Sequence, residues 1–149
     1  MKILLATDGS DYAKEAAAQC GEFVSGCEKP IVKIITVADY SADVASEPFM
    51  SSKEFVEAVE EEMRKKSQKI LSEAEKIVRY KNEGVEISKE MYVGSAKKII
   101  VDEAANWRAD LIVMGSHGYG FLKRAFLGSV SDAVLHHASC SVLIVRKTE

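Results

Sequence analysis

Glycine and hydroxyl residues gather in the segment of the chain that could do chemistry. Gly115-Ser116-His117-Gly118 is followed, after nine residues, by Gly128-Ser129-Val130-Ser131. The apolar run Leu111–Met114 precedes this segment, and a helix-like segment, Asp132–Ala138, follows it. Glycine lets a backbone approach an anion closely, and a helix start offers unpaired N–H groups and about half a positive charge. The order of strand, glycine loop and helix start therefore predicts a phosphate-binding site.

The glycine spacing differs from that of two well-known phosphate-binding loops. A Walker A loop counted from Gly115 would need Lys and then Ser or Thr where Phe121 and Leu122 stand. A dinucleotide-binding fingerprint counted from Gly118 would need a third glycine where Lys123 stands. The segment is therefore neither of these loops.

The full spacing, Gly-x2-Gly-x9-Gly-Ser, resembles the nucleotide-binding motif of the universal stress protein family, in its ATP-binding branch. The likeness covers nearly all of the chain. Ala6–Ser10 resembles the family's first strand-to-helix turn, Thr36–Asp39 the end of its second strand, and Tyr92–Gly94 the end of its third. The resemblance implies a Rossmann-like fold of the adenine nucleotide alpha-hydrolase type, with strand order 3-2-1-4-5. It also implies that the backbone N–H and C=O of Val37 contact the adenine edge.

Strand-like and helix-like segments alternate along the chain, which predicts an α/β fold with a doubly wound, five-stranded parallel sheet. The predicted strands are Lys2–Thr7, Ile31–Ala38, Val85–Val93, Leu111–Met114 and Ser141–Arg146. The predicted helices run from Ser10 or Asp11 to about Gly26, from Ser51 or Ser52 to about Asn82, over Ser95–Trp107, and from Gly128-Ser129 onwards. A flexible loop is expected over Tyr40–Met50. In the implied strand order, ligands bind where the order reverses, and the loops that meet there begin at Asp8 and Gly115.

Length, charge and cysteine content narrow the class of protein. A chain of 149 residues predicts a single domain over residues 1–149. A net charge of −3 argues against a nucleic-acid partner, and no apolar run reaches the roughly 18 residues that a membrane span needs. The N-terminus enters a strand at once, so we expect no signal peptide. The three cysteines are odd in number and widely spaced, which favours a reduced, cytoplasmic location.

Each residue of the predicted site has a binding role and a plainer alternative. Gly115 and Gly118 would let the backbone curl around phosphates, or they only make a tight turn. Ser129 and Ser131 would offer hydroxyl groups, and Val130 a backbone N–H, to phosphate oxygens. The alternative for the serines is a simple helix cap.

Acidic and basic side chains near these glycines have open roles. Asp8 would bind a ribose or base group, or hold Mg²⁺ through water; its alternative is a turn formed with Gly9. His117 would shuttle protons or shape the loop by hydrogen bonding. Lys123 and Arg124 would clamp phosphates or form a solvated basic pair.

Three functions compete on this evidence. The first is an ATP-binding regulator, a nucleotide-dependent switch with at most slow hydrolysis, because the segment lacks a Walker lysine and a clear base for an attacking water. In this hypothesis ATP, with Mg²⁺, orders Tyr40–Met50 and Tyr119–Leu127 for an unidentified regulatory partner protein. The second is a slow ATPase or another adenine-nucleotide hydrolase. The third is an interaction module that binds no nucleotide.

The last predicted strand has the character of an exposed sheet edge. It is short and apolar, with Val142, Leu143, Ile144 and Val145 in succession. Such an edge pairs readily with another strand. The family resemblance implies an antiparallel homodimer across this strand.

Overall fold

Five parallel strands form one sheet in the computed structural model, which describes residues 1–39, 53–118 and 127–147. The strand order is β3-β2-β1-β4-β5. The strands are β1 (Lys2–Ala6), β2 (Ile31–Ala38), β3 (Glu86–Val93), β4 (Leu111–Gly115) and β5 (Ser141–Val145). The predicted fold class and strand order are therefore confirmed, with strand boundaries that differ by one residue at most.

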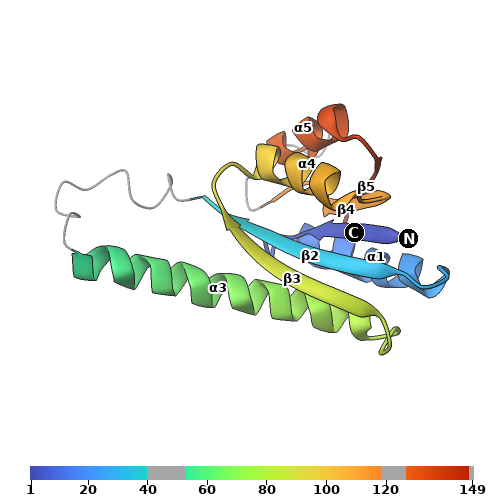
Figure 1. Ribbon diagram of the computed structural model, residues 1–149, viewed down its shortest axis with the longest axis horizontal. Coiled ribbons are helices and arrows are strands. Elements are labelled where there is room, and N and C mark those ends of the chain that lie inside the picture. The colour runs from blue at the N-terminus through green and yellow to red at the C-terminus, as the bar shows by residue number, and fades with distance from the viewer. Residues whose placement is uncertain (40–52, 119–126, 148–149) are drawn as a thin grey trace.

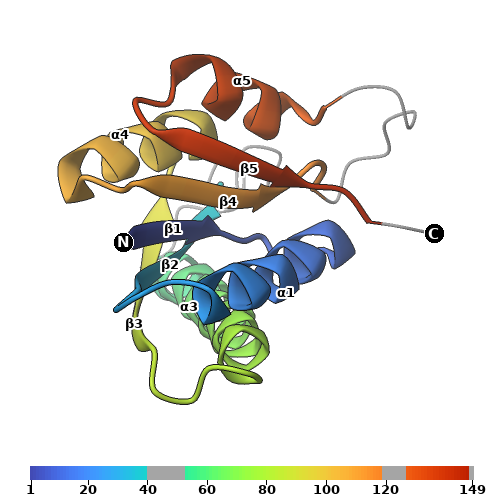
Figure 2. The same cartoon turned by 90° about the vertical axis from the view of Figure 1, so that its right-hand side faces the viewer.

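Helices cover both faces of the sheet (Figures 1 and 2). They are α1 (Asp11–Ser25), α3 (Lys53–Arg79), α4 (Ala96–Trp107) and α5 (Ser129–His137). The pair α1 and α3 lies on one face, and the pair α4 and α5 lies on the other (Figure 1). None of these described helices is both long and apolar enough to cross a membrane.

The central strand β1 explains why two layers of helices are needed. Ile3, Leu4 and Leu5 are all fully buried. Because successive side chains point to opposite faces, Ile3 and Leu5 join the core under α1 and α3, whereas Leu4 joins the core under α4 and α5. An apolar run without alternation is typical of a parallel strand that is covered on both faces.

Helix α1 packs on the sheet through a narrow stripe of small side chains. The buried positions are Ala13, Ala16, Ala17, Cys20, Gly21 and Val24. The helix begins where predicted, because the Ser10 side chain accepts a hydrogen bond from the Ala13 backbone N–H at 3.3 Å. Phe23 also keeps helical spacing in the sequence, but it is 42% exposed because it lies at the margin of this stripe.

Helix α3 is long enough to extend beyond the sheet (Figure 1). Its 27 residues span about 40 Å. Its buried residues lie in its second half: Ser67, Leu71, Ala74 and Val78. Apolar residues at helical spacing continue in the sequence to Phe55, Val59 and Met63, which are only partly buried. The predicted start at Ser51 or Ser52 and the loop Tyr40–Met50 lie outside the described residues.

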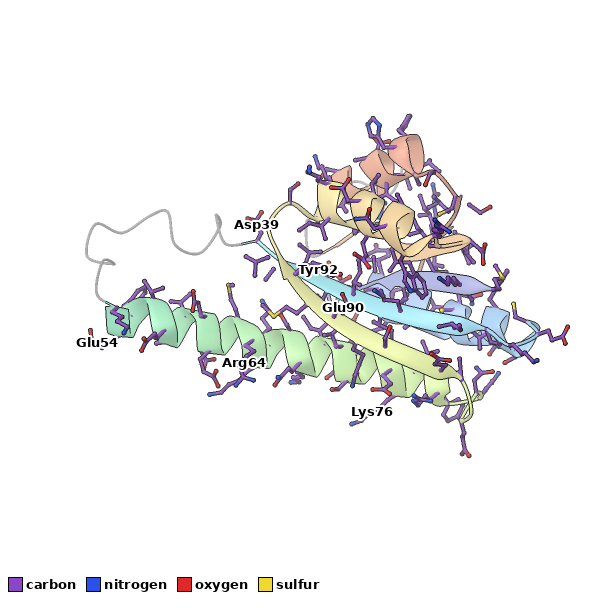
Figure 3. All side chains as sticks on the ribbon, in the orientation of Figure 1. Asp39, Glu54, Arg64, Lys76, Glu90 and Tyr92 are labelled. Atoms are coloured by element: carbon purple, nitrogen blue, oxygen red, sulfur yellow. The ribbon has the colours of Figure 1, made fainter. Side chains whose placement is uncertain are left out.

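A group of polar side chains joins β2 and β3 to α4, and we call it the Lys33 network. The Lys33 Nζ atom lies 2.9 Å from Glu90 Oε1 and 2.8 Å from Glu103 Oε1. The Tyr92 hydroxyl donates to the other carboxylate oxygen of Glu90, and the Trp107 ring lies 5.4 Å from Lys33 Nζ. Glu90 and Tyr92 are labelled together on β3, beside α4, in Figure 3.

The charges of the Lys33 network are stabilised by one another. Burial opposes the charged form of Lys33, but hydrogen bonds to Glu103 and Glu90 outweigh it and raise the Lys33 pKa above 10.5. The hydrogen bond from Tyr92, followed by that from Lys33, lowers the pKa of Glu90 below 4.5. Burial, with the neighbouring Glu90 and Glu103, raises the pKa of Tyr92. The network therefore holds α4 against the sheet through a set of mutually satisfied groups.

Candidate functional site

A cleft opens at the carboxyl ends of β1 and β4. The chain leaves β1 toward α1 on one face and leaves β4 toward α5 on the other (Figure 2). This reversal is where ligands bind in open α/β sheets. The cleft is lined by all eight residues that the sequence predicts for the site: Asp8, Val37, Gly115, Gly118, Gly128, Ser129, Val130 and Ser131.

The turn after β1 holds Asp8 in place and leaves one of its oxygens facing the opposite loop. The Gly9 N–H donates to Thr7 Oγ1 at 3.2 Å, and the Ser10 N–H donates to Asp8 Oδ1 at 2.9 Å. Gly9 has a φ of 81°, a conformation that favours glycine. Asp8 Oδ2 lies 2.6 Å from the position that a Cβ atom on Gly118 would occupy. Asp8 thus forms the turn that was its alternative role, and it also borders the cleft with its second oxygen.

At each of the three motif glycines, an added side chain would meet a different neighbour. A Cβ atom on Gly128 would lie 3.2 Å from the Ser116 carbonyl oxygen and 3.3 Å from the His117 Cα. A Cβ atom on Gly118 would meet Asp8, as above. A Cβ atom on Gly115 would instead lie 2.8 Å from the Tyr12 carbonyl carbon, in the contact between β4 and α1. Gly118 and Gly128 therefore leave room inside the cleft, whereas Gly115 allows α1 to pack against β4.

The N-terminus of α5 forms one wall of the cleft and has no side-chain cap. Its cap residue is Gly128, whose N–H donates to the Ser116 carbonyl at 2.8 Å. The Ser131 hydroxyl lies 2.9 Å from the Ser116 and Gly128 carbonyl oxygens, so its proton is directed to the backbone. The first N–H groups of a helix have no partner within the helix. Those of Ser129 and Val130 are therefore available to an anion, in contrast to the start of α1, which Ser10 caps.

The opposite wall of the cleft is apolar and is bordered by the end of β2. The Thr7 N–H donates to the Ile35 carbonyl at 2.9 Å, and this is the last contact of β2 with β1. Alternate residues of a strand present their backbone groups to the same neighbour. Val37 therefore presents its N–H and C=O beyond the end of β1, where a flat ring could bind to them.

His117 also lines the cleft, although the sequence left its role open. Its Nδ1 atom lies 3.0 Å from Ser116 Oγ, and its ring centroid lies 5.2 Å from that of Tyr12. Its Nε2 atom is buried and has no hydrogen-bond partner among the described residues. In the sequence, the signal that His117 lines the cleft was its position between two loop glycines.

Several apolar residues of the site were missed by sequence analysis. They are Ile35, Ala96, Ile100 and Met114, which line the cleft beside Val37. In the sequence they have the pattern of ordinary core positions, so nothing distinguishes them before the fold is known. Lys123 and Arg124 lie outside the described residues, as does all of Tyr119–Leu127 except Leu127. Within the described part of the chain, no three His, Cys, Asp or Glu side chains gather in a group that could hold a metal ion.

Comparisons with known proteins agree with this architecture. A sequence model of the universal stress protein family matches residues 1–146. Universal stress protein MJ0531 of Methanocaldococcus jannaschii is 34% identical over 146 residues, which are 98% of this chain and 82% of that protein. The solved structure of the hypothetical protein MJ0577 has a TM-score of 0.79 and 27% identity, covering 99% of this chain and 96% of its own. The universal stress protein from Archaeoglobus fulgidus, in complex with dAMP, has a TM-score of 0.57 and 25% identity, covering 97% of each chain.

Proposed function

Because the chain belongs to the universal stress protein family, we propose that it binds ATP together with Mg²⁺ and acts as a nucleotide-dependent regulatory switch with at most slow hydrolysis. The observation that carries this proposal is the joint position of two features in one cleft. The uncapped N-terminus of α5 suits phosphate groups. The apolar wall beside Val37 suits an adenine ring.

The arrangement of the cleft supports an adenine nucleotide in one orientation. Phosphates would lie at the start of α5, against Gly128 and Ser129. The base would lie against Ile35 and Ile100, with its edge toward the Val37 backbone. A related structure, the Archaeoglobus fulgidus protein, contains dAMP. The second oxygen of Asp8 would bind a ribose hydroxyl group, or Mg²⁺ through water.

Binding is favoured over catalysis by the side chains that face the cleft. Asp8 and His117 are the titratable groups among its described lining residues. Asp8 is held by the turn after β1, and Phe121 stands where a Walker lysine would be. Phosphoryl transfer needs positioned cations and a positioned nucleophile, so the lining supports a regulator with slow background hydrolysis. A slow ATPase or another adenine-nucleotide hydrolase is the alternative, and its turnover above the slow background would be lost in His117→Ala.

The first test is mass spectrometry of the small molecules released when freshly purified protein is denatured. We expect ATP. Release of ADP or AMP would favour the hydrolase, and turnover with Mg-ATP would then be measured. Absence of any nucleotide, together with no thermal shift on adding Mg-ATP, would contradict the proposal and favour the interaction module without nucleotide.

We also propose a homodimer through β5. This strand forms one edge of the described sheet. Val142, Leu143 and Ile144 are partly buried and Val145 is buried, so the strand is well anchored while its outer backbone edge stays available. Light scattering should give twice the chain mass of 16.4 kDa. A monomer at micromolar concentration would contradict this interface. The cytoplasmic location and the regulatory partner protein stay predictions.

A further inference from the structure

His117 is fixed at the cleft by contacts around its ring. Its Nδ1 atom lies 3.0 Å from Ser116 Oγ. The Tyr12 ring packs on it at a tilt of 47°. Its Cα lies 3.3 Å from the position of a Cβ atom on Gly128, the cap residue of α5. The His117 backbone therefore lies beside the uncapped start of that helix, and its ring lies against Tyr12 in the cleft that this helix start also lines.

The hydrogen bond with Ser116 is compatible with a tautomer that carries the ring proton on Nε2. Ser116 is fully buried, and its hydroxyl has one proton to donate. Among the described residues, the acceptor within reach of Ser116 Oγ is His117 Nδ1. A buried hydroxyl donates where an acceptor is available. With Ser116 as the donor to Nδ1, the neutral ring carries its own proton on Nε2.

The Nε2–H group is then a buried donor that lacks an acceptor. Nε2 has no hydrogen-bond partner among the described residues. Buried polar groups in folded proteins are nearly always paired, and an exception calls for a ligand, water or ion. The start of α5, which lines the same cleft as His117, favours negative charge. An anionic oxygen is therefore the partner that fits both features.

We propose that His117 Nε2–H donates a hydrogen bond to a phosphate oxygen of the bound nucleotide. This inference rests on the proposed function and adds a residue that binds the phosphates. In this tautomer Nε2 has no lone pair to take a proton from water. His117 therefore holds a phosphate and does not act as a general base through Nε2, which favours a binding protein over a hydrolase.

The first test measures affinity by calorimetry for three probes: Mg-ATP, inorganic tripolyphosphate and adenosine. His117→Phe keeps a ring against Tyr12 but removes both ring nitrogens. It should weaken Mg-ATP and tripolyphosphate about ten- to a hundred-fold, as for a lost hydrogen bond to a charged group. Adenosine affinity should not change. His136→Phe replaces an exposed histidine of α5 and should leave all three affinities unchanged.

The outcomes separate this inference from the function on which it rests. If the unsubstituted protein binds none of the probes, the proposed function fails. If it binds Mg-ATP and His117→Phe binds as tightly, only the role of His117 fails. An equal loss for adenosine would assign His117 to the base or sugar and would also overturn the inference.

A second test uses the unsubstituted protein, so it does not depend on how the variant folds. Nitrogen-15 labelling of histidine reports only three residues, His117, His136 and His137. Long-range proton–nitrogen spectra should give the Nε2–H tautomer for His117. Tripolyphosphate should then shift its Nε2 resonance while those of His136 and His137 stay in place. The Nδ1–H tautomer, or a His117 resonance that ignores tripolyphosphate, would overturn the inference.

Discussion

Two polar clusters, the Lys33 network under α4 and the cleft at the carboxyl ends of β1 and β4, differ in how completely their hydrogen bonds are made. In the Lys33 network, Lys33 contacts two carboxylates, and Glu90 also accepts a hydrogen bond from Tyr92. In the cleft, His117 Nε2 has no partner among the described residues, and no side chain caps α5. The fold thus carries one closed cluster, the Lys33 network, and one open cluster, at the cleft.

This difference separates architecture from binding. A buried polar group left without a partner costs free energy, so a fold that keeps one must gain elsewhere. The Lys33 network satisfies itself and fixes α4, whose Ala96 and Ile100 form part of the cleft wall. The open cluster needs an external group to complete it. Substitutions in the closed cluster should therefore change stability, and substitutions in the open cluster should change ligand affinity.

The largest expected effect comes from Gly128→Val, which places a side chain in the open cluster. A side chain at this position meets Ser116 and His117 and blocks the start of α5. ATP at about 100 times its Kd should stabilise the unsubstituted protein by roughly 2.7 kcal/mol. This stabilisation raises Tm by several degrees, since each kcal/mol is worth about 2–4 °C at this chain size. The variant should lose this shift entirely, as measured by thermal denaturation with and without Mg-ATP.

Gly84→Val is the matched control for that substitution. Gly84 lies in the turn before β3, and a Cβ atom there would have no heavy atom within 4 Å. The control should therefore keep the full ATP shift. If Gly128→Val also kept it, the phosphates would not lie at the start of α5, and the assignment of the open cluster would be wrong.

Lys33→Met removes the cation that pairs with both carboxylates of the closed cluster. It should lower the free energy of unfolding by about 2–3 kcal/mol. Fully buried pairs that lose one partner cost about 3–5 kcal/mol, and the value is lower here because Glu90 is 43% exposed. Urea unfolding measures the change. The ATP shift should persist in this variant, since no atom of the Lys33 network lines the cleft.

Lys81→Met provides the surface comparison for Lys33→Met. Lys81 and Glu22 form an ion pair in which both side chains are more than half exposed. Exposed pairs contribute about 0–1 kcal/mol, so this variant should stay close to the unsubstituted protein. Equal losses for the two variants would show that the Lys33 network is no more than a surface ion pair.

Most of the fold could be predicted from the sequence because its signals are local and strong. Ile3-Leu4-Leu5 lacks alternation and therefore predicts a strand buried on both faces, and Ser10 marks the start of α1 by its capping chemistry. Phe23 shows the limit of helical periodicity. Spacing places it near the apolar stripe of α1, but only the packing of α1 on the sheet decides that it stays exposed.

The site could be predicted only where its residues differ from ordinary core or turn residues. Glycines at fixed spacing led to the cleft, but they did not show that Gly115 also allows a close contact with α1. Ile35 and Ile100 were missed because an apolar wall and a core have the same composition. The Lys33 network was also missed, because it joins residues of three elements that lie far apart in the sequence.

Gly115→Ala and Gly118→Ala sharpen the comparison within a single motif. The added methyl group of Gly115→Ala meets the backbone of Tyr12, so it should lower the free energy of unfolding by about 1–3 kcal/mol, as overpacking does. ATP affinity should change little. The methyl group of Gly118→Ala meets Asp8 Oδ2 and should weaken ATP binding with little loss of stability. Paired urea unfolding and ATP titration of both variants would test this, and a reversed pattern would contradict the division of roles.

The smallest expected effect is the acid dependence of the closed cluster. The pKa of Glu90 is lowered from 4.5, first by the hydrogen bond from Tyr92 and then by Lys33. A carboxyl group with a lowered pKa in the folded state stabilises the fold fully above its unfolded pKa, and this contribution is lost as pH falls through the folded pKa. Tyr92→Phe removes the larger cause. Urea midpoints should therefore decline less in Tyr92→Phe than in the unsubstituted protein as pH falls below about 4.5. The control substitution is Lys14→Met. Lys14 is exposed and lies 3.7 Å from Glu73, on the opposite face of the sheet. Added to both proteins, Lys14→Met should leave the difference between their acid profiles in place. Parallel acid profiles for Tyr92→Phe and the unsubstituted protein would mean that the hydrogen bond from Tyr92 does not stabilise the charged form of Glu90. The Lys33 network would then not be closed at Tyr92.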